Sequence, residues 1–149
     1  MPTYHVIKKI ETSATEISMC SDDIMRVMFK KNTEIDPPIF KEMFEIFNGL
    51  IEGKRYPYIY FVEDSSVIFT NEGREYSKQN ELAFPKICNA FIVKSLAHKL
   101  IANFYLKFNK PVYPSKVFSN MADAETWCLE YYNQYHNPNH KKSKTIVLS

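Results

Sequence analysis

The sequence predicts an α/β fold, in which an N-terminal β-hairpin joins a mixed, mainly parallel sheet of about four to five strands flanked by about four helices. Residues 94–132 carry the sharpest pattern: a capped helix, a proline-marked crossover, a short strand and a second capped helix. Residues 55–62 and 87–93 are apolar or aromatic at nearly every position, as in strands covered on both faces. Strands that alternate with helices in this way indicate βαβ units with right-handed crossovers.

Three segments near the N-terminus have the composition of strands. They span residues 4–10, 14–20 and 24–30. Ser21-Asp22-Asp23 supplies a tight turn between the last two, so residues 14–30 are predicted to form a β-hairpin. This hairpin makes the predicted sheet mixed rather than wholly parallel.

The first long helix is predicted to begin at Pro37, with Asp36 as its cap. An aspartate side chain accepts a hydrogen bond from an orphan backbone N–H, and proline is tolerated at the first helical position because its N–H would be unpaired there. Gly53 suits a left-handed stop. The apolar face recurs at helical spacing and consists of Phe40, Met43, Phe44, Phe47 and Leu50.

A weaker helix is predicted after the strand 55–62. Residues 64–69 form a connection, Thr70 is the expected cap, and the helix extends to about Gln79. A short helical turn is expected over residues 80–85.

Ser95 stands where the cap of the next helix belongs. Pro111 and Pro114 cannot continue a helix, so the chain must turn after Asn109. The predicted buried face of this helix consists of Leu96, Leu100, Ile101, Phe104 and Phe108, with Lys99, Asn103 and Lys107 on the other side.

A strand over residues 115–118 and a final helix complete the predicted fold. Ser119 or Asn120 caps that helix, and Asp123 lies near its positive end. Its buried stripe is predicted to consist of Ala124, Trp127, Cys128 and Tyr131.

The chain is predicted to form one domain over residues 1–136, followed by a basic extension over residues 137–149. With 149 residues it is long enough to bury a substantial core. The extension carries three lysines and no acid. Its last apolar stretch, residues 145–148, is expected to dock as an edge strand or against a neighbouring molecule.

Composition limits the partners and the compartment. The chain has 19 Lys and Arg against 17 Asp and Glu, and because three of the lysines lie in the extension, the domain itself is close to neutral and a poor match for nucleic acid. No apolar run approaches the roughly 20 residues of a membrane span. The N-terminus lacks the apolar core of a signal peptide, so we expect a cytoplasmic protein that binds neither nucleic acid nor membrane. A homodimer is compatible with a chain that is 15% aromatic.

The residue pattern gives no basis for an enzyme, a metal site or a cofactor. Cys20, Cys88 and Cys128 match neither a disulfide framework nor a zinc motif, and each is expected in the core. No G-x-S-x-G elbow is present, and no histidine pair has the spacing of metal ligands. Three glycines are too few for a phosphate-cradling loop. We therefore predict a non-enzymatic protein with no catalytic residues.

Two clusters of side chains leave alternatives open. Tyr58 and Tyr60 share one face of their strand and, with Phe91, either line a pocket for an apolar or lipid-like small molecule or pack beneath a helix. The other cluster borders the crossover 107–116 and either receives an acidic partner or an anion, or is simply solvated. It consists of Lys99, Lys107, Lys110 and Lys116.

Short motifs are spread over about residues 14–132. They are Gly73-Arg74-Glu75-Tyr76, Ser95-Leu96-Ala97, Ile101-Ala102-Asn103-Phe104, Lys107-Phe108-Asn109-Lys110-Pro111, and Ala124 with Trp127. Together with the order of the elements, they resemble the STAS or SpoIIAA-like superfamily of anti-sigma-factor antagonists, and especially a group of small uncharacterised bacterial STAS-like proteins. The resemblance implies a SpoIIAA-like α/β fold and a regulatory role through protein contacts.

In regulatory members of that superfamily, a serine at the start of the helix after the central strand accepts phosphate, within an Asp-Ser-Ser-Gly-like motif. The best placement here is Thr70-Asn71-Glu72-Gly73, so the phosphoacceptor position falls on Glu72, whose carboxylate resembles a phosphorylated residue in charge. The resemblance therefore implies a regulatory or interaction domain without an intact phosphoacceptor serine. It would present Thr70, Asn71, Glu72 and Arg74 to an unidentified protein partner. The alternative is a small-molecule-binding module.

Overall fold

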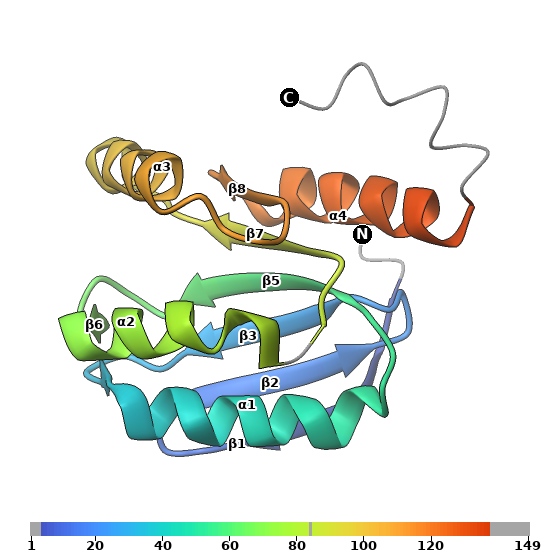
Figure 1. Ribbon diagram of the computed structural model, residues 1–149, viewed down its shortest axis with the longest axis horizontal. Helices are drawn as coiled ribbons and strands as arrows, with labels where there is room; N and C mark the ends of the chain where they lie inside the picture. The colour runs from blue at the N-terminus through green and yellow to red at the C-terminus, as the bar shows by residue number, and fades with distance from the viewer. Residues whose placement is uncertain (1–3, 84, 138–149) are drawn as a thin grey trace.

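The computed structural model describes residues 4–83 and 85–137, and its centre is a mixed six-stranded sheet (Figure 1). The strands are β1 (Val6–Glu11), β2 (Thr15–Cys20), β3 (Met25–Phe29), β5 (Pro57–Val62), β7 (Cys88–Ile92) and β8 (Ser115–Phe118), and they lie side by side in that order. β1, β2 and β3 pair in antiparallel fashion, whereas β3, β5, β7 and β8 are parallel. This topology confirms the predicted hairpin and the mainly parallel sheet that follows it.

A second, two-stranded sheet joins two loops. β4 (Glu34–Ile35) and β6 (Ile68–Phe69) pair in parallel, with Ile35 opposite Phe69. The sequence predicts only a connection over residues 64–69, because a strand of two residues is too short to show an alternating pattern. The pairing brings the starts of two helices together, since the Thr70 backbone N–H donates to the Ile35 carbonyl at 3.2 Å.

Within residues 4–83 and 85–137, four α-helices and one short 3-10 helix flank the sheet. They are α1 (Pro37–Ile51), α2 (Asn71–Gln79), η1 (Glu81–Ala83), α3 (Leu96–Asn109) and α4 (Met121–His136). Each α-helix begins with a side chain that accepts from a backbone N–H three residues on, and these caps are Asp36, Thr70, Ser95 and Asn120. The predicted caps are thus confirmed, with Asn120 rather than Ser119 at α4. At the end of α1 the left-handed cap is Glu52, followed by Gly53, which also has a positive φ.

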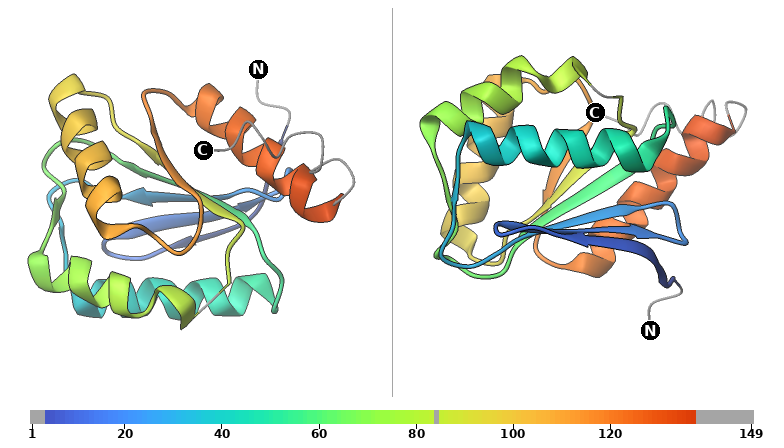
Figure 2. Two further views of the ribbon diagram at one scale, coloured as in Figure 1. Left: turned by 45° about the horizontal axis from the view of Figure 1, so that its top comes forward. Right: turned by 90° about the horizontal axis from the view of Figure 1, so that it is seen from below.

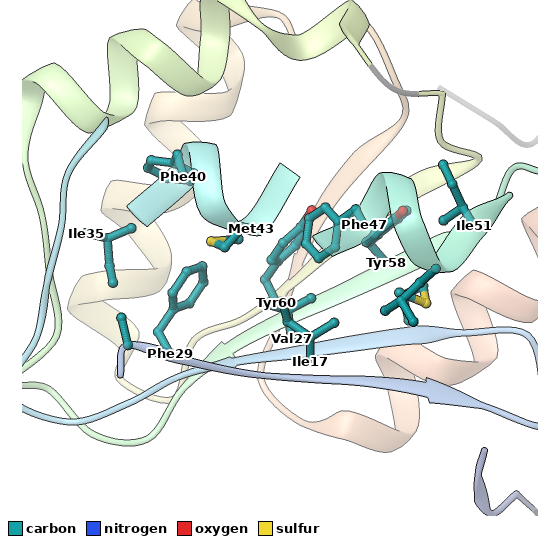
Figure 3. Close-up of a cluster of buried hydrophobic side chains, with 13 residues drawn as sticks. Ile17, Val27, Phe29, Ile35, Phe40, Met43, Phe47, Ile51, Tyr58 and Tyr60 are labelled. Atoms are coloured by element: carbon teal, nitrogen blue, oxygen red, sulfur yellow. The ribbon is translucent and has the colours of Figure 1, made fainter. Parts of the chain in front are cut away.

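One face of the sheet packs beneath α1 and forms the larger core (Figure 3). Phe47 of α1 lies against Tyr58 of β5, with ring centroids 5.1 Å apart. Ile17 and Val27 support them from β2 and β3, and all four side chains are fully buried. Of the face predicted for this helix, Phe40, Met43, Phe47 and Leu50 are buried and Phe44 is half-buried.

The opposite face packs beneath α4 (Figures 1 and 2). Ala124 and Cys128 of α4 are fully buried against Ile59 and Ala90 of the sheet, and Trp127 packs on Phe118 with ring centroids 5.5 Å apart. Of the buried stripe predicted for the last helix, Ala124 and Cys128 are buried, and Trp127 and Tyr131 are half-buried against the same core.

A buried arginine also ties β3 to α4. Arg26 is 6% exposed, and its guanidinium donates to both carboxylate oxygens of Asp22, at 3.0 and 2.8 Å, and to Glu125 at 2.7 Å. Two carboxylates and a stacked Tyr4 ring compensate the burial of this charge. The contact fixes the hairpin against α4.

The predicted buried face of α3 is wrong at its amino-terminal end. Leu96 is 73% exposed and Leu100 is 63% exposed. Lys99, expected on the outer side, is half-buried and donates to Ser119 at 3.0 Å. The physical reason is that α3 packs against β8, which is the edge strand of the sheet. The side chains of Ile101, Phe104 and Phe108, the rest of the predicted face, lie outside the described part of the structure. The predicted docking of residues 145–148 lies outside the described residues.

Candidate functional site

The first turn of α2 holds the residues that the sequence marked as a partner surface. The Thr70 hydroxyl accepts from the Gly73 N–H at 2.9 Å, so this threonine is occupied as the cap and is only half-buried. Asn71, Glu72 and Arg74 are exposed. The surface therefore consists of exposed side chains on a helix whose start is firmly held.

Gly73 allows α2 to approach α1 closely. This glycine is buried, and a Cβ atom built on it would overlap the Ile35 carbonyl oxygen and lie 3.2 Å from the Cα of Asp36. Only glycine therefore fits at this contact. The close approach places the amino-terminal ends of both helices next to each other (Figure 2).

A shallow groove of about 460 Å³ lies where α2 meets the start of α1. It opens broadly to solvent and is lined by Pro37, Asn71, Glu72, Glu75, Tyr76 and Gln79. Of these six residues, Asn71 and Glu72 were predicted from the sequence and the other four were not. A signal was present, because residues 72, 75, 76 and 79 share one helical face by their spacing.

The face of α2 that lines the groove is acidic. Glu72 and Glu75 line it, whereas Arg74 and Lys78 do not. Arg74 is two positions from both Glu72 and Tyr76, and side chains two positions apart do not face the same side of a helix. The side chain of Tyr76 stacks on Phe44 of α1 with ring centroids 6.1 Å apart, which gives the groove an apolar floor beside its acidic wall.

The structure brings together the three residues of the suggested ligand pocket. Tyr58 and Tyr60 stack with centroids 6.0 Å apart, and Tyr60 and Phe91 with centroids 5.5 Å apart. Tyr58 is completely buried and Tyr60 is 8% exposed, and both belong to the core beneath α1. Burial raises the pKa of both phenols, so they stay neutral. The rings thus pack beneath a helix, which is one of the two alternatives that the sequence leaves open. Ligand binding at these rings stays a prediction.

Lys86, which was not predicted as a site residue, contacts this aromatic cluster. Its Nζ donates to the Tyr60 hydroxyl at 2.7 Å and to Asn89 Oδ1 at 3.1 Å. The same atom lies 4.9 Å from the centre of the Tyr58 ring and 5.0 Å from that of Tyr60. Burial lowers the pKa of Lys86 to about 7. In the sequence this lysine only flanks an apolar strand, and flanking lysines are ordinarily solvated.

The four lysines around the crossover do not form one compact cluster. Lys99 lies near the amino-terminal end of α3, whereas Lys110 caps its far end, about 16 Å away at 1.5 Å per residue. Lys107 is exposed in the last turn of α3, and Lys116 of β8 lies over the Phe118 ring at 5.5 Å.

The described part of the chain offers little other chemistry. Within residues 4–83 and 85–137, no group of three His, Cys, Asp or Glu side chains is placed to hold a metal ion. No helix in the same ranges is long and apolar enough to cross a membrane. The three cysteines are free and buried, as predicted, and Cys88 and Cys128 have their sulfur atoms 4.0 Å apart.

Comparison with known sequence families shows which family this chain belongs to. The sequence model of a family described as a domain of unknown function, DUF7793, matches residues 18–132. The chain belongs to the DUF7793 family. The match covers the region from β2 to α4, which includes the groove and Lys86. No curated protein matches the sequence.

Solved structures show which fold this DUF7793 protein has. It is similar to an uncharacterised protein of the DUF3478 family with a SpoIIAA-like fold from Shewanella loihica PV-4, with 11% identity, a TM-score of 0.51, and coverage of 84% of this chain and 93% of that one. A protein of unknown function from Arthrobacter sp. FB24 is also matched, at 22% identity over 80% of this chain and 95% of that one, with a TM-score of 0.29. The first similarity shows a SpoIIAA-like fold, as the sequence motifs implied, and it says nothing of an activity.

Proposed function

We propose that this DUF7793 protein is a non-enzymatic regulatory domain that binds another protein, and that the groove between α1 and α2 receives a basic segment of that partner. The observation that carries the proposal is the combination of an apolar floor and an acidic wall in one open groove.

The two helices that form the groove are held firmly in place, and this favours the groove as a binding surface. Asp36 and Thr70 cap the two helices, β4 and β6 pair just before them, and Gly73 allows their close contact. A surface that is already ordered loses little conformational entropy when a partner binds. The groove is thus a better docking surface than a loop of the same composition.

Charge indicates the chemistry of the partner. Glu72 and Glu75 give the groove two negative charges, and Glu72 also lies in the first turn of α2, where the helix dipole stabilises a carboxylate. Lysine or arginine side chains of a partner complement these charges, and an apolar side chain between them can cover Pro37 and Tyr76. A partner segment with both features fits the groove best.

The position of Glu72 also indicates how such a domain would be controlled. In the regulatory proteins that the sequence resembles, the corresponding position carries a serine that is phosphorylated and dephosphorylated. A glutamate there supplies a permanent negative charge that no kinase or phosphatase can add or remove. We infer that binding at this groove is constitutive with respect to phosphorylation of that position.

Selection from a random peptide display library on the folded domain tests the proposal. We expect enrichment of peptides that combine lysine or arginine with an apolar residue. A synthetic peptide of the enriched composition, followed by fluorescence anisotropy, should bind at least about tenfold more weakly to the double variant Glu72→Gln, Glu75→Gln. Its binding should also weaken as the salt concentration rises.

The matched control is Arg74→Gln with Lys78→Gln, which changes the same number of charges at positions of α2 that do not line the groove. This control should bind the peptide as well as the wild type, or more tightly. Enrichment of acidic or uncharged peptides would overturn the proposal, as would equal binding by the two double variants.

A further inference from the structure

The amino-terminal half of α3 exposes two leucines to solvent. Leu96 is 73% exposed and Leu100 is 63% exposed, and the exposed Asn103 and Lys107 follow them at helical spacing. Residues spaced in this way share one face of a helix, and these four are called the α3 stripe below. In Figure 2, the amino-terminal end of α3 is the end farther from α2. The α3 stripe is thus a solvent-facing surface with an apolar part and a basic end.

The part of the chain around the α3 stripe carries positive charge only. No aspartate or glutamate lies between Glu81 and Asp123, a segment that contains β7, α3 and β8. The groove between α1 and α2 has the opposite sign, because Glu72 and Glu75 line it. One chain therefore presents both an acidic and a basic surface. The lysines of the segment are Lys86, Lys94, Lys99, Lys107, Lys110 and Lys116.

We propose that the partner of the groove is a second copy of this chain, and that the groove of one copy receives the α3 stripe of the next. The inference rests on the proposed function and names the partner of that same groove. Leu100 of one copy covers the apolar floor at Tyr76 of the other, and Lys107 pairs with Glu72 and Glu75. The α3 stripe combines the apolar and basic side chains that the groove fits best.

The spacing of the two features is similar on the two surfaces. Leu100 and Lys107 are separated by about 10 Å along α3, at 1.5 Å per residue. Tyr76 and Glu72 are separated by about 6 Å along α2. The long aliphatic stem of the lysine can span the difference. The apolar contact and the ion pair can therefore form at the same time.

The two surfaces differ, so the contact is head-to-tail. Such a contact leaves a free groove on one copy and a free α3 stripe on the other, and it continues into a ring or a filament. One open groove and one helix face make a small interface, and small interfaces are typical of weak association. Self-association should therefore increase with protein concentration and decrease with added salt.

Sedimentation velocity of the full chain, at concentrations up to about 1 mM, tests the inference. The groove variant is Glu72→Gln with Glu75→Gln, and the stripe variant is Leu100→Gln with Lys107→Gln. Each variant alone should self-associate at least about tenfold more weakly than the wild type. An equimolar mixture of the two should form a 1:1 complex with the affinity of the wild-type contact. The reason is that the groove variant keeps an intact α3 stripe and the stripe variant keeps an intact groove.

The matched control is Leu82→Gln with Lys78→Gln. It makes the same two changes of residue type as the stripe variant, at exposed positions that belong neither to the α3 stripe nor to the groove lining. This control should self-associate like the wild type. Circular dichroism checks that the variants are folded, and the dependence of the wild type on concentration and salt is a test that needs no variant.

Three results would overturn the inference. They are a wild type that stays monomeric over the whole range, a mixture that associates no better than its components, and a loss of self-association in the stripe variant alone. The last result would show that two copies meet through α3 on both sides. Selection of peptides on the folded domain tests the proposed function separately. Basic peptides that bind the groove would leave that function standing if the chain does not self-associate, whereas their absence as well would remove both.

Discussion

At the scale of single residues, Gly73 has the clearest structural role. In the sequence, Gly73 stands out only as part of the motifs that carry the family resemblance, and these give it no packing role. The structure shows that the carbonyl of Ile35 occupies the place where a side chain would begin. The reason is a contact between segments that are almost forty residues apart, so no local pattern could have predicted it.

Gly73→Ala should destabilise the domain by about 1–3 kcal/mol, the usual cost of forcing an extra carbon into a closely packed contact. Gly49→Ala is the matched control, since no atom lies within 4 Å of a Cβ built there and the residue is exposed within α1. That change should stabilise the domain by about 0.5–1 kcal/mol, because alanine favours a helix over glycine. Urea unfolding followed by circular dichroism measures both. Equal effects of the two substitutions would refute the assigned role of Gly73.

At the scale of elements, sequence reasoning succeeded where a signal is local. Asp36, Thr70 and Ser95 cap their helices as predicted, because a cap depends only on the residue and the three that follow it. It failed for β4 and β6, whose two-residue pairing depends on a distant partner. It also failed for Leu96 and Leu100, because helical spacing identifies an apolar face but not how much of that face the sheet covers.

Two leucines test how α3 is packed. Leu100→Ala should change the free energy of unfolding by less than about 0.5 kcal/mol, because this side chain is 63% exposed. Leu50→Ala in α1 should cost about 2–5 kcal/mol, since Leu50 is 8% exposed and packs in the core.

Urea unfolding at two protein concentrations measures both leucine variants. A large loss for Leu100→Ala at both concentrations would mean that α3 is buried as its spacing predicted. A loss that appears only at the higher concentration would show that a second copy of the chain covers this face, in line with the predicted homodimer.

At the scale of the whole molecule, the sequence was sufficient to predict the class of fold but not to predict the candidate site. Alternating apolar strands and capped helices predicted the α/β order, and a SpoIIAA-like fold is what the structural comparison shows. The groove, by contrast, requires Pro37 of α1 to meet Tyr76 of α2, and the contact between Lys86 and Tyr60 requires β5 and β7 to lie side by side. Both depend on how separate elements pack together, and the spacing of residues within one element does not predict this packing.

The pH dependence of global stability follows from Lys86. Its pKa is about 7 in the folded chain and about 10.4 in an unfolded one, so between these values the unfolded chain binds more protons. Stability therefore rises with pH through this window and is lowest below pH 7, where the buried amine is charged. Above about pH 8.5 Cys88 opposes the trend, because its raised pKa keeps the folded thiol protonated while the unfolded thiol ionises.

Urea unfolding between about pH 7 and 8, below the cysteine range, isolates the contribution of the lysine. The wild type should gain up to about 1 kcal/mol per pH unit relative to Lys86→Met, which has no amine to titrate. The exposed Lys94→Met is the matched control and should keep the slope of the wild type. Parallel curves for the wild type and Lys86→Met would show that the amine keeps an ordinary pKa in the folded chain. That result would leave the groove proposal intact, because Lys86 does not line the groove.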